Sequence, residues 1–170
     1  MFGLTPLGIV HTAISLVALA AGFASLIRFG EIAARHPLGR TYIWATVLTC
    51  LTGFGIFQHG GFGAPHVLGI LTLAVLGIAA LAGRNKIFGR ASRAIEMISY
   101  STTLFFHMIP GLTETFTRFP ASGPWFSGPE DPNLQKAVGV CFVILVIGCV
   151  LQIRGLARQT PASLPGGGVA

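Results

Sequence analysis

The sequence predicts an all-α integral membrane protein, a bundle of five transmembrane helices. Two observations carry this prediction. The 170 residues are 52% hydrophobic and only 9% charged, whereas charged residues make up about 25% of a typical soluble domain. Apolar runs of about twenty residues, the length that crosses a bilayer core as a helix, also recur along the chain. The length corresponds to one domain, and the composition makes the lipid bilayer its surroundings.

Five apolar segments follow one another, with expected bounds 6–27, 41–58, 66–82, 94–115 and 134–153. A backbone in lipid finds no water to bond, so each spanning segment is a helix or part of a closed barrel. The runs are continuous and do not alternate with period two, which favours helices. Pro110 and Gly111 are expected to interrupt the fourth helix. Residues 1–158 form the predicted membrane domain, and the Pro/Gly-rich stretch 159–170 is a predicted disordered tail.

Lysine and arginine are distributed unevenly between the two sets of loops. Only Arg118 and Lys136 fall on one side. The other side holds the remaining nine, which are Arg28, Arg35, Arg40, Arg84, Lys86, Arg90, Arg93, Arg154 and Arg158. Because cytoplasmic loops carry the excess of Lys and Arg, this predicts the N-terminus outside and the C-terminus in the cytoplasm. The net charge of +6 therefore reports topology, and no basic cluster with interleaved aromatic residues points to nucleic acid.

Four of the five histidines are predicted to meet in the outer half of the bundle. His59 and His66 flank the loop FQHGGFGAPHVLG, whose glycines permit a sharp reversal. His11 lies in the first turns of the first segment, and His107 lies roughly 5 Å beyond the midplane on the fourth. Glu114 follows His107 by seven residues and shares its face if the helix continues. Ionisable groups in spanning segments usually face the bundle interior or a water-filled cavity.

This cluster predicts a cofactor or metal site, because neutral imidazole binds haem iron, zinc and copper. The candidate cofactor-binding residues are His11, His59, His66 and His107, and the candidate ligands of a bare metal ion are the same four with Glu114. Haem b or a transition metal is the expected group, and electron transfer the expected function. A stripe of small and polar residues on the first segment would make room for a macrocycle. Its members are His11, Ser15, Ala18, Gly22 and Ser25.

Other functions stay open at this point. The same groups could relay protons or bind a quinone-like or lipid head group. The small-residue faces also fit a non-enzymatic scaffold or accessory subunit, packed against a membrane-protein partner or a second copy of the chain. Transport of a small solute or of protons has less support, because no inverted repeat is visible. Whether the chain is an enzyme stays undecided, although nucleophilic chemistry is disfavoured because no serine has an evident His/Asp partner set.

Two features of the inner loops are given structural roles. Arg93 and Glu96 are expected to form an interfacial ion pair, and His36, which precedes Pro37, is expected in a turn or against lipid head groups. Neither is assigned a chemical role.

The chain also resembles a family of bacterial membrane proteins, domain-of-unknown-function family 2306. The family opens with a histidine on an Ala/Leu/Gly helix, followed by a His-x-x-Gly-Arg-x-Tyr turn. The matching residues are His11, Ala18, Gly22, His36, Gly39, Arg40 and Tyr42. GGFGAPHVLGILTLAVLGIAAL is similar to the family's entry into its third helix, with His66 at the matching histidine, and MISYSTTLFFHMIPGLTETFTRFP resembles its fourth-helix region.

The resemblance covers about residues 10–120. Two departures are visible: Pro37 stands where the family usually has arginine, and SRAIEM lacks a histidine that often precedes the fourth helix. A site that needs an inner histidine pair from those positions is therefore not expected. The resemblance implies a multi-pass helical fold in the bacterial inner membrane, and it brings no activity or substrate.

Overall fold

The computed structural model confirms the all-helical fold. It describes residues 5–56, 61–85, 87–118 and 123–159, and these ranges contain five α-helices, one 3₁₀ helix and no strand. In chain order the helices are α1 (Pro6–Phe29), α2 (Pro37–Gly53), α3 (Ala64–Asn85), η1 (Gly89–Ala91), α4 (Ser92–Phe116) and α5 (Pro132–Gln159). His59 lies outside the described residues, and so does the predicted tail beyond Gln159.

Local sequence signals explain where α1 begins and ends. The Thr5 hydroxyl accepts a hydrogen bond from the Gly8 N–H at 3.1 Å, and Pro6 occupies the first helical position, where its missing N–H costs nothing. Gly30 ends the helix in the left-handed conformation with φ 72°, and its N–H bonds the Leu26 carbonyl at 2.9 Å. The sequence therefore specifies both ends of this helix.

The second helix is shifted relative to its prediction. It begins at Pro37, four residues before the expected position 41, because proline suits the first turn of a helix. It ends at Gly53, five residues before the expected position 58. The result is a helix of 17 residues, the shortest of the five α-helices in the described ranges.

Pro110 does not interrupt α4, so that prediction is wrong. The helix runs unbroken from Ser92 to Phe116 with Pro110 inside it. Proline at this position removes the hydrogen bond to the carbonyl four residues earlier, and its ring crowds that carbonyl. α4 packs against both α3 and α5, and neighbouring helices commonly let membrane helices tolerate proline.

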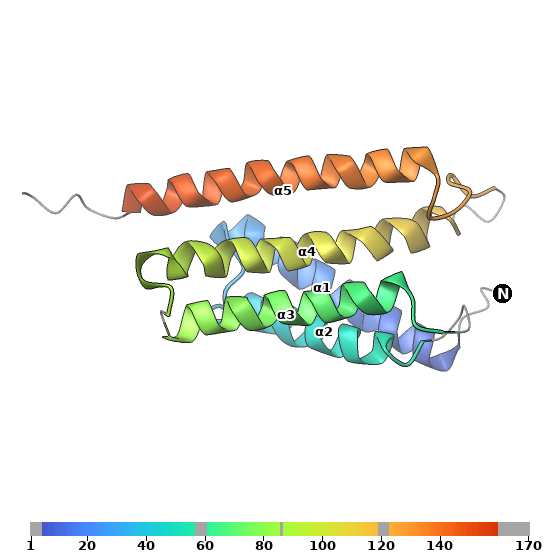
Figure 1. Cartoon of the computed structure of the whole chain (residues 1–170), viewed down its shortest axis with the longest axis horizontal. Helices are drawn as coiled ribbons and strands as arrows, with labels where there is room; N and C mark the ends of the chain where they lie inside the picture. Colours follow the sequence, from blue (N-terminus) through green and yellow to red (C-terminus); the bar gives the residue numbers. More distant parts are fainter. Residues whose placement is uncertain (1–4, 57–60, 86, 119–122, 160–170) are drawn as a thin grey trace, which may run out of the picture.

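Consecutive helices lie side by side and run in alternating directions (Figure 1). α4 packs between α3 and α5 and also touches α1, whereas α5 packs on no described helix except α4. Figure 1 shows α5 along one edge of the bundle, with most of its surface away from the other helices.

The outer surface is dominated by apolar side chains, unlike that of a water-soluble domain. Large hydrophobic side chains point outward, with Ile27 85% exposed and Leu16 59% exposed. The interior combines a hydrophobic core, which includes Tyr42, Tyr100 and Leu104, with buried polar groups. The buried polar and charged residues of the described ranges are Ser25, Glu31, Thr46, Thr49, His66, Thr72, Ser92, Glu96, Ser101, Thr103 and His107. An apolar outer surface over an interior that holds the polar groups is the arrangement that suits a protein surrounded by lipid.

Three of the described helices are long and apolar enough to cross a membrane. They cover Pro6–Phe29, Ala64–Arg84 and Pro132–Arg158. α2 has only 17 residues and is shorter than these three. α4 carries several charged and polar groups, among them Arg93, Glu96 and Glu114. The chain is therefore an all-helical protein with three candidate membrane-spanning helices.

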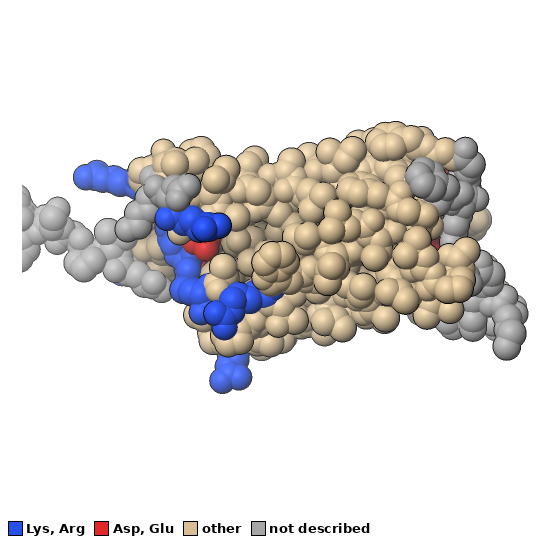
Figure 2. Space-filling view, turned by 90° about the horizontal axis from the view of Figure 1, so that it is seen from below, with Lys and Arg blue, Asp and Glu red and all other residues tan. Residues whose placement is uncertain are grey.

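Most of the described lysine and arginine residues lie at one end of the molecule. Figure 2 shows the Lys and Arg side chains of this face at the end where the α3–α4 connection lies, while the rest of the face is free of blue. This separation agrees with the uneven distribution of Lys and Arg between the loops.

The small residues of α1 allow close helix packing, so the part of the predicted stripe around Gly22 does not leave room for a macrocycle. Ala18, Gly22 and Ser25 are all buried. A Cβ atom added at Gly22 would lie 2.9 Å from both the Tyr42 ring and the Leu104 side chain. Glycine is thus needed here so that α1 can approach α2 and α4.

Candidate functional site

A cavity of about 260 Å³ lies at the end of the bundle opposite the Lys/Arg cluster, between α1, α2, α3 and α4. Its lining includes His11, His66, His107 and Glu114, so the structure brings together all the predicted site residues that it describes. Apolar side chains such as Phe54 make up much of the remaining wall. Small-molecule sites have the same combination of apolar walls and few polar groups, although their typical volume of about 300–1,000 Å³ is larger than that of this cavity.

His11 reaches the cavity from α1 and is held by α2. Its Nδ1 lies 3.0 Å from the Thr52 hydroxyl oxygen. A Cβ added at Gly53 would lie 3.2 Å from the His11 ring, so glycine there gives the imidazole its space. Thr52 itself donates its hydroxyl proton to backbone carbonyls of α2, at 2.8 Å to Leu48 and 3.1 Å to Thr49.

His107 reaches the same cavity from α4 and is also held by α2. Its Nε2 lies 3.1 Å from the hydroxyl oxygen of Thr46, whose side chain is fully buried. The Tyr42 ring packs edge-on against the imidazole, with ring centroids 6.2 Å apart. One helix, α2, thus orients histidines from two different helices.

Tyr42 continues the polar contacts beyond the cavity. Its hydroxyl lies 2.7 Å from that of Thr103, which donates to the Tyr100 carbonyl at 2.8 Å. Because the single Thr103 proton is used for this carbonyl, Thr103 accepts from Tyr42. Tyr42 and Thr103 are both fully buried.

His66 has a structural role at the start of α3. Its Nδ1 accepts a hydrogen bond from the Gly63 N–H at 3.2 Å, and its own N–H bonds the Gly63 carbonyl at 3.0 Å. The Nδ1 contact is one half of a capping box, with histidine at the position usually held by Glu or Gln, and the Gly63 backbone carbonyl stands in for the missing N-cap side chain. The Phe62 ring also stacks on it, with centroids 5.2 Å apart.

Glu114 lies at the exposed side of the cavity. Its side chain is 59% exposed and forms an ion pair at 2.5 Å with Arg118, four residues later on the chain. Arg118 also lines the cavity, and Glu114 lies close enough to His11 for an electrostatic interaction. The two charged groups therefore mark one edge of an otherwise neutral site.

The predicted bare-metal site gains no support from the described residues. Within them, no group of three His, Cys, Asp or Glu side chains is placed to share one metal ion. The predicted ligand His59 lies outside these residues, so the complete predicted set is not tested.

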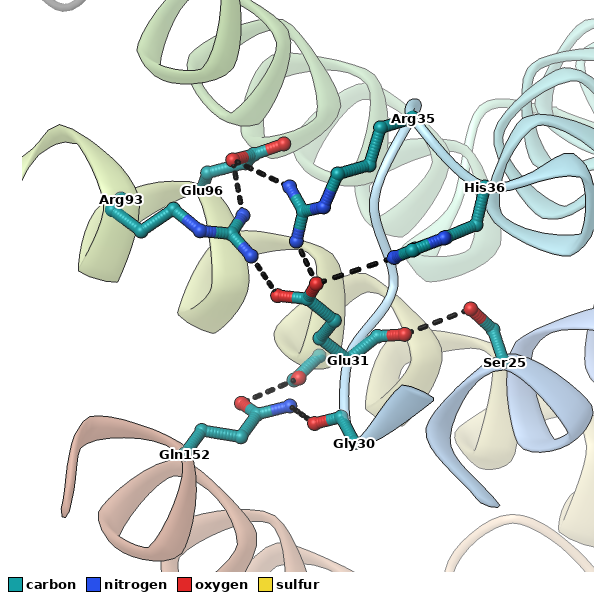
Figure 3. A network of polar contacts seen from close by, with 9 residues as sticks. Ser25, Gly30, Glu31, Arg35, His36, Arg93, Glu96 and Gln152 are labelled. Atoms are coloured by element: carbon teal, nitrogen blue, oxygen red, sulfur yellow. Dashed lines mark hydrogen bonds and ion pairs between the residues drawn. The ribbon is translucent and has the colours of Figure 1, made fainter. Parts of the chain in front are cut away.

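A second polar cluster, at the Lys/Arg-rich end, is centred on Glu31. Figure 3 shows its carboxylate between Arg35 and Arg93, and it forms an ion pair with each of them. Arg93 also bonds Glu96 at 2.6 Å. The predicted Arg93–Glu96 pair is therefore present, but as part of a larger network, in which both carboxylate side chains are about 10% exposed or less.

The same cluster joins four parts of the chain, which are α1, the α1–α2 connection, α4 and α5. The His36 Nε2 lies 3.4 Å from the Glu31 carboxylate, and its ring stacks on Phe29 with centroids 4.0 Å apart. The Gln152 amide on α5 donates to the Gly30 carbonyl at 3.0 Å. Sequence reasoning missed Glu31, although a lone acid between two apolar segments could have drawn attention to it.

Comparison of the chain with protein-family models, with curated proteins and with solved structures found no match.

Proposed function

We propose that this chain is a multi-pass protein of the bacterial inner membrane that binds a redox cofactor, haem b or a transition metal, in the histidine-lined cavity and serves electron transfer. The proposal includes five spans, with the N-terminus outside and the C-terminus in the cytoplasm. The proposal has two parts, the membrane topology and the cofactor site, and each is supported separately.

The packing of α2 and α4 among the three apolar helices supports five spans. α2 has 17 residues and a length of about 26 Å, close to the roughly 30 Å of a bilayer core. It packs between α1 and α3, and α4 packs between α3 and α5. If the three apolar helices cross a membrane, their two neighbours in this antiparallel bundle cross it with them. The excess of Lys and Arg at one end supports placing that end in the cytoplasm.

Cysteine labelling of spheroplasts, before and after lysis, tests this topology. In a chain whose three native cysteines are replaced by serine, we expect Gly123→Cys to react with a membrane-impermeant maleimide in spheroplasts. We expect Ile87→Cys, which is equally accessible in the fold, to react only after lysis, because it lies at the Lys/Arg-rich end. Labelling of Ile87→Cys but not Gly123→Cys before lysis would reverse the orientation. Labelling of both before lysis would contradict the span number.

One observation carries the cofactor proposal: His11 and His107, from two helices, line one largely apolar cavity, and a threonine of α2 holds a ring nitrogen of each. Metal-binding histidines characteristically donate their second ring N–H to an acceptor, usually a carboxylate, a backbone carbonyl or water, and here the threonine hydroxyl oxygens lie in that place. Haem iron needs only one or two protein ligands, so haem suits this arrangement better than a bare ion, which needs more.

Chemical analysis of the purified protein tests the cofactor proposal. The full chain, extracted from membranes in mild detergent, is expected to contain iron in about one-to-one ratio with protein, recovered as haem b by acid–acetone extraction. A stoichiometric content of copper without haem would support the transition-metal version. A monodisperse protein without stoichiometric iron or copper, or one that holds only zinc, which has no redox chemistry, would contradict the proposal.

A further inference from the structure

Three of the threonines of α2 form a row of hydroxyl groups beside the cavity, called the ladder below. Thr46, Thr49 and Thr52 are spaced three residues apart and so share one face of the helix. Thr49 lines the cavity and donates to the Ala45 carbonyl at 2.8 Å. The other two contact the histidines, so this face determines how the imidazoles are presented.

The ladder fixes the tautomer of His11. A threonine hydroxyl has one proton, and Thr52 donates it to the carbonyls of its own helix. The contact of 3.0 Å with His11 is favourable only if Nδ1 carries a proton and donates to Thr52. In the neutral ring, Nε2 then has the lone pair.

The same reasoning applies to His107. Tyr42 donates to Thr103, which leaves the lone pairs of the Tyr42 oxygen for Thr46, whose hydroxyl lies beside it. With its proton directed to Tyr42, Thr46 accepts from His107 Nε2–H. The lone pair of His107 is then on Nδ1.

His66 has the opposite arrangement to His11. Its Nδ1 accepts from the Gly63 backbone, so in the neutral ring Nε2 carries the proton. The cavity is therefore lined by two histidines with a nitrogen lone pair not used by α2 and by one histidine whose N–H is at Nε2.

We propose that the α2 hydroxyl ladder sets the ligand class of the cavity by holding His11 as the Nδ1–H tautomer, with Nε2 as an electron-pair donor. The ligand is then an electron-pair acceptor, such as haem iron, and Thr52 is the positioning residue. A ligand that offers only carbonyl acceptors is disfavoured at His11. This inference rests on the proposed function for its cofactor, whereas the tautomer itself can be measured without one.

Nitrogen-15 NMR of histidine-labelled, cofactor-free protein in detergent micelles tests the tautomer directly. At a pH where the ring is neutral, we expect His11 to show a protonated Nδ1 and an unprotonated Nε2, with its signals identified by their loss in His11→Asn. The Thr52→Val variant is expected to shift this population toward Nε2–H. A wild-type His11 protonated at Nε2 would overturn the inference, whatever the protein binds.

Cofactor binding supplies the second test, with variants matched in shape. Thr52→Val is expected to lower cofactor affinity by about 10–100-fold, the usual effect of losing such an orienting partner. Thr52→Ser keeps the hydroxyl and should bind like wild type. Thr102→Val is the control, because Thr102 does not line the cavity and gives its proton to the Ile98 carbonyl at 2.9 Å. Equal affinities for Thr52→Val and wild type, or an equal loss in Thr102→Val, would contradict the inference.

These outcomes separate the two proposals. A protein that shows the expected His11 tautomer but carries no iron or copper would support the inference about the ladder and contradict the proposed function. A protein that binds haem equally well as wild type and as Thr52→Val would support the proposed function and contradict the inference about the ladder.

Discussion

Replacement of Gly39 by alanine is expected to cost more than about 4 kcal/mol and so to prevent accumulation of folded protein. A Cβ atom at this position would lie 2.0 Å from the Ala33 carbonyl oxygen and 2.8 Å from its carbon. Both are backbone atoms of Ala33, which is fully buried together with Ile32. Neither the Ala33 backbone nor the new Cβ atom can therefore move aside. Thermal unfolding in detergent, together with the yield of monodisperse protein, measures the effect.

Gly77→Ala is the matched control for this prediction. Gly77 also lies within a helix, α3, and a Cβ there would meet no atom within 4 Å. Alanine favours the helix over glycine by about 0.5–1 kcal/mol, so this variant should be at least as stable as wild type. If Gly39→Ala unfolds at the same temperature as Gly77→Ala, the close packing of the α1–α2 connection on α2 is wrong.

Replacement of Glu31 by glutamine is expected to lower the free energy of unfolding by about 3 kcal/mol, the lower end of the range for breaking a buried ion pair. The Glu31 side chain is only 10% exposed and pairs with Arg35 and with Arg93. Its loss leaves two guanidinium groups to share Glu96. The value lies at the lower end because both arginines are partly exposed. Thermal unfolding of wild type and variant in the same detergent gives the difference.

Glu114→Gln provides the comparison. Glu114 pairs with Arg118 at the same spacing of four residues as Glu31 and Arg35, but its side chain is 59% exposed. Exposed pairs contribute less than about 1 kcal/mol, so this variant should unfold close to wild type. Equal losses in the two variants would show that burial does not distinguish the two pairs.

Much of the helical order could be predicted from the sequence, because each apolar run ends at a local signal. Thr5, Pro6 and Gly30 define α1, and Pro37 defines the start of α2 once its preference for a first turn is given enough weight. The prediction at Pro110 was wrong because a local rule about proline was applied without the packing on both sides of it.

The candidate site was predictable in its residues but not in its contacts. Alternating helix directions place His11, His66 and His107 at one end, and the cavity lining agrees. The partners Thr46 and Thr52 could not be identified, because they depend on the rotation of α2 about its axis. The ion pair between Glu31 and Arg93 joins residues 62 positions apart and depends on how the connection before α2 meets α4.

The reduced-minus-oxidised visible difference spectrum tests the central claim, that the histidine-lined cavity binds a redox cofactor, most directly. It should be recorded on wild type, His11→Ala, His107→Ala and, as a control from the Lys/Arg-rich end, His36→Ala. We expect haem bands in wild type and His36→Ala, and their loss in both cavity variants. A wild-type spectrum without redox-dependent bands, or bands that persist unchanged in both His11→Ala and His107→Ala, would contradict the claim.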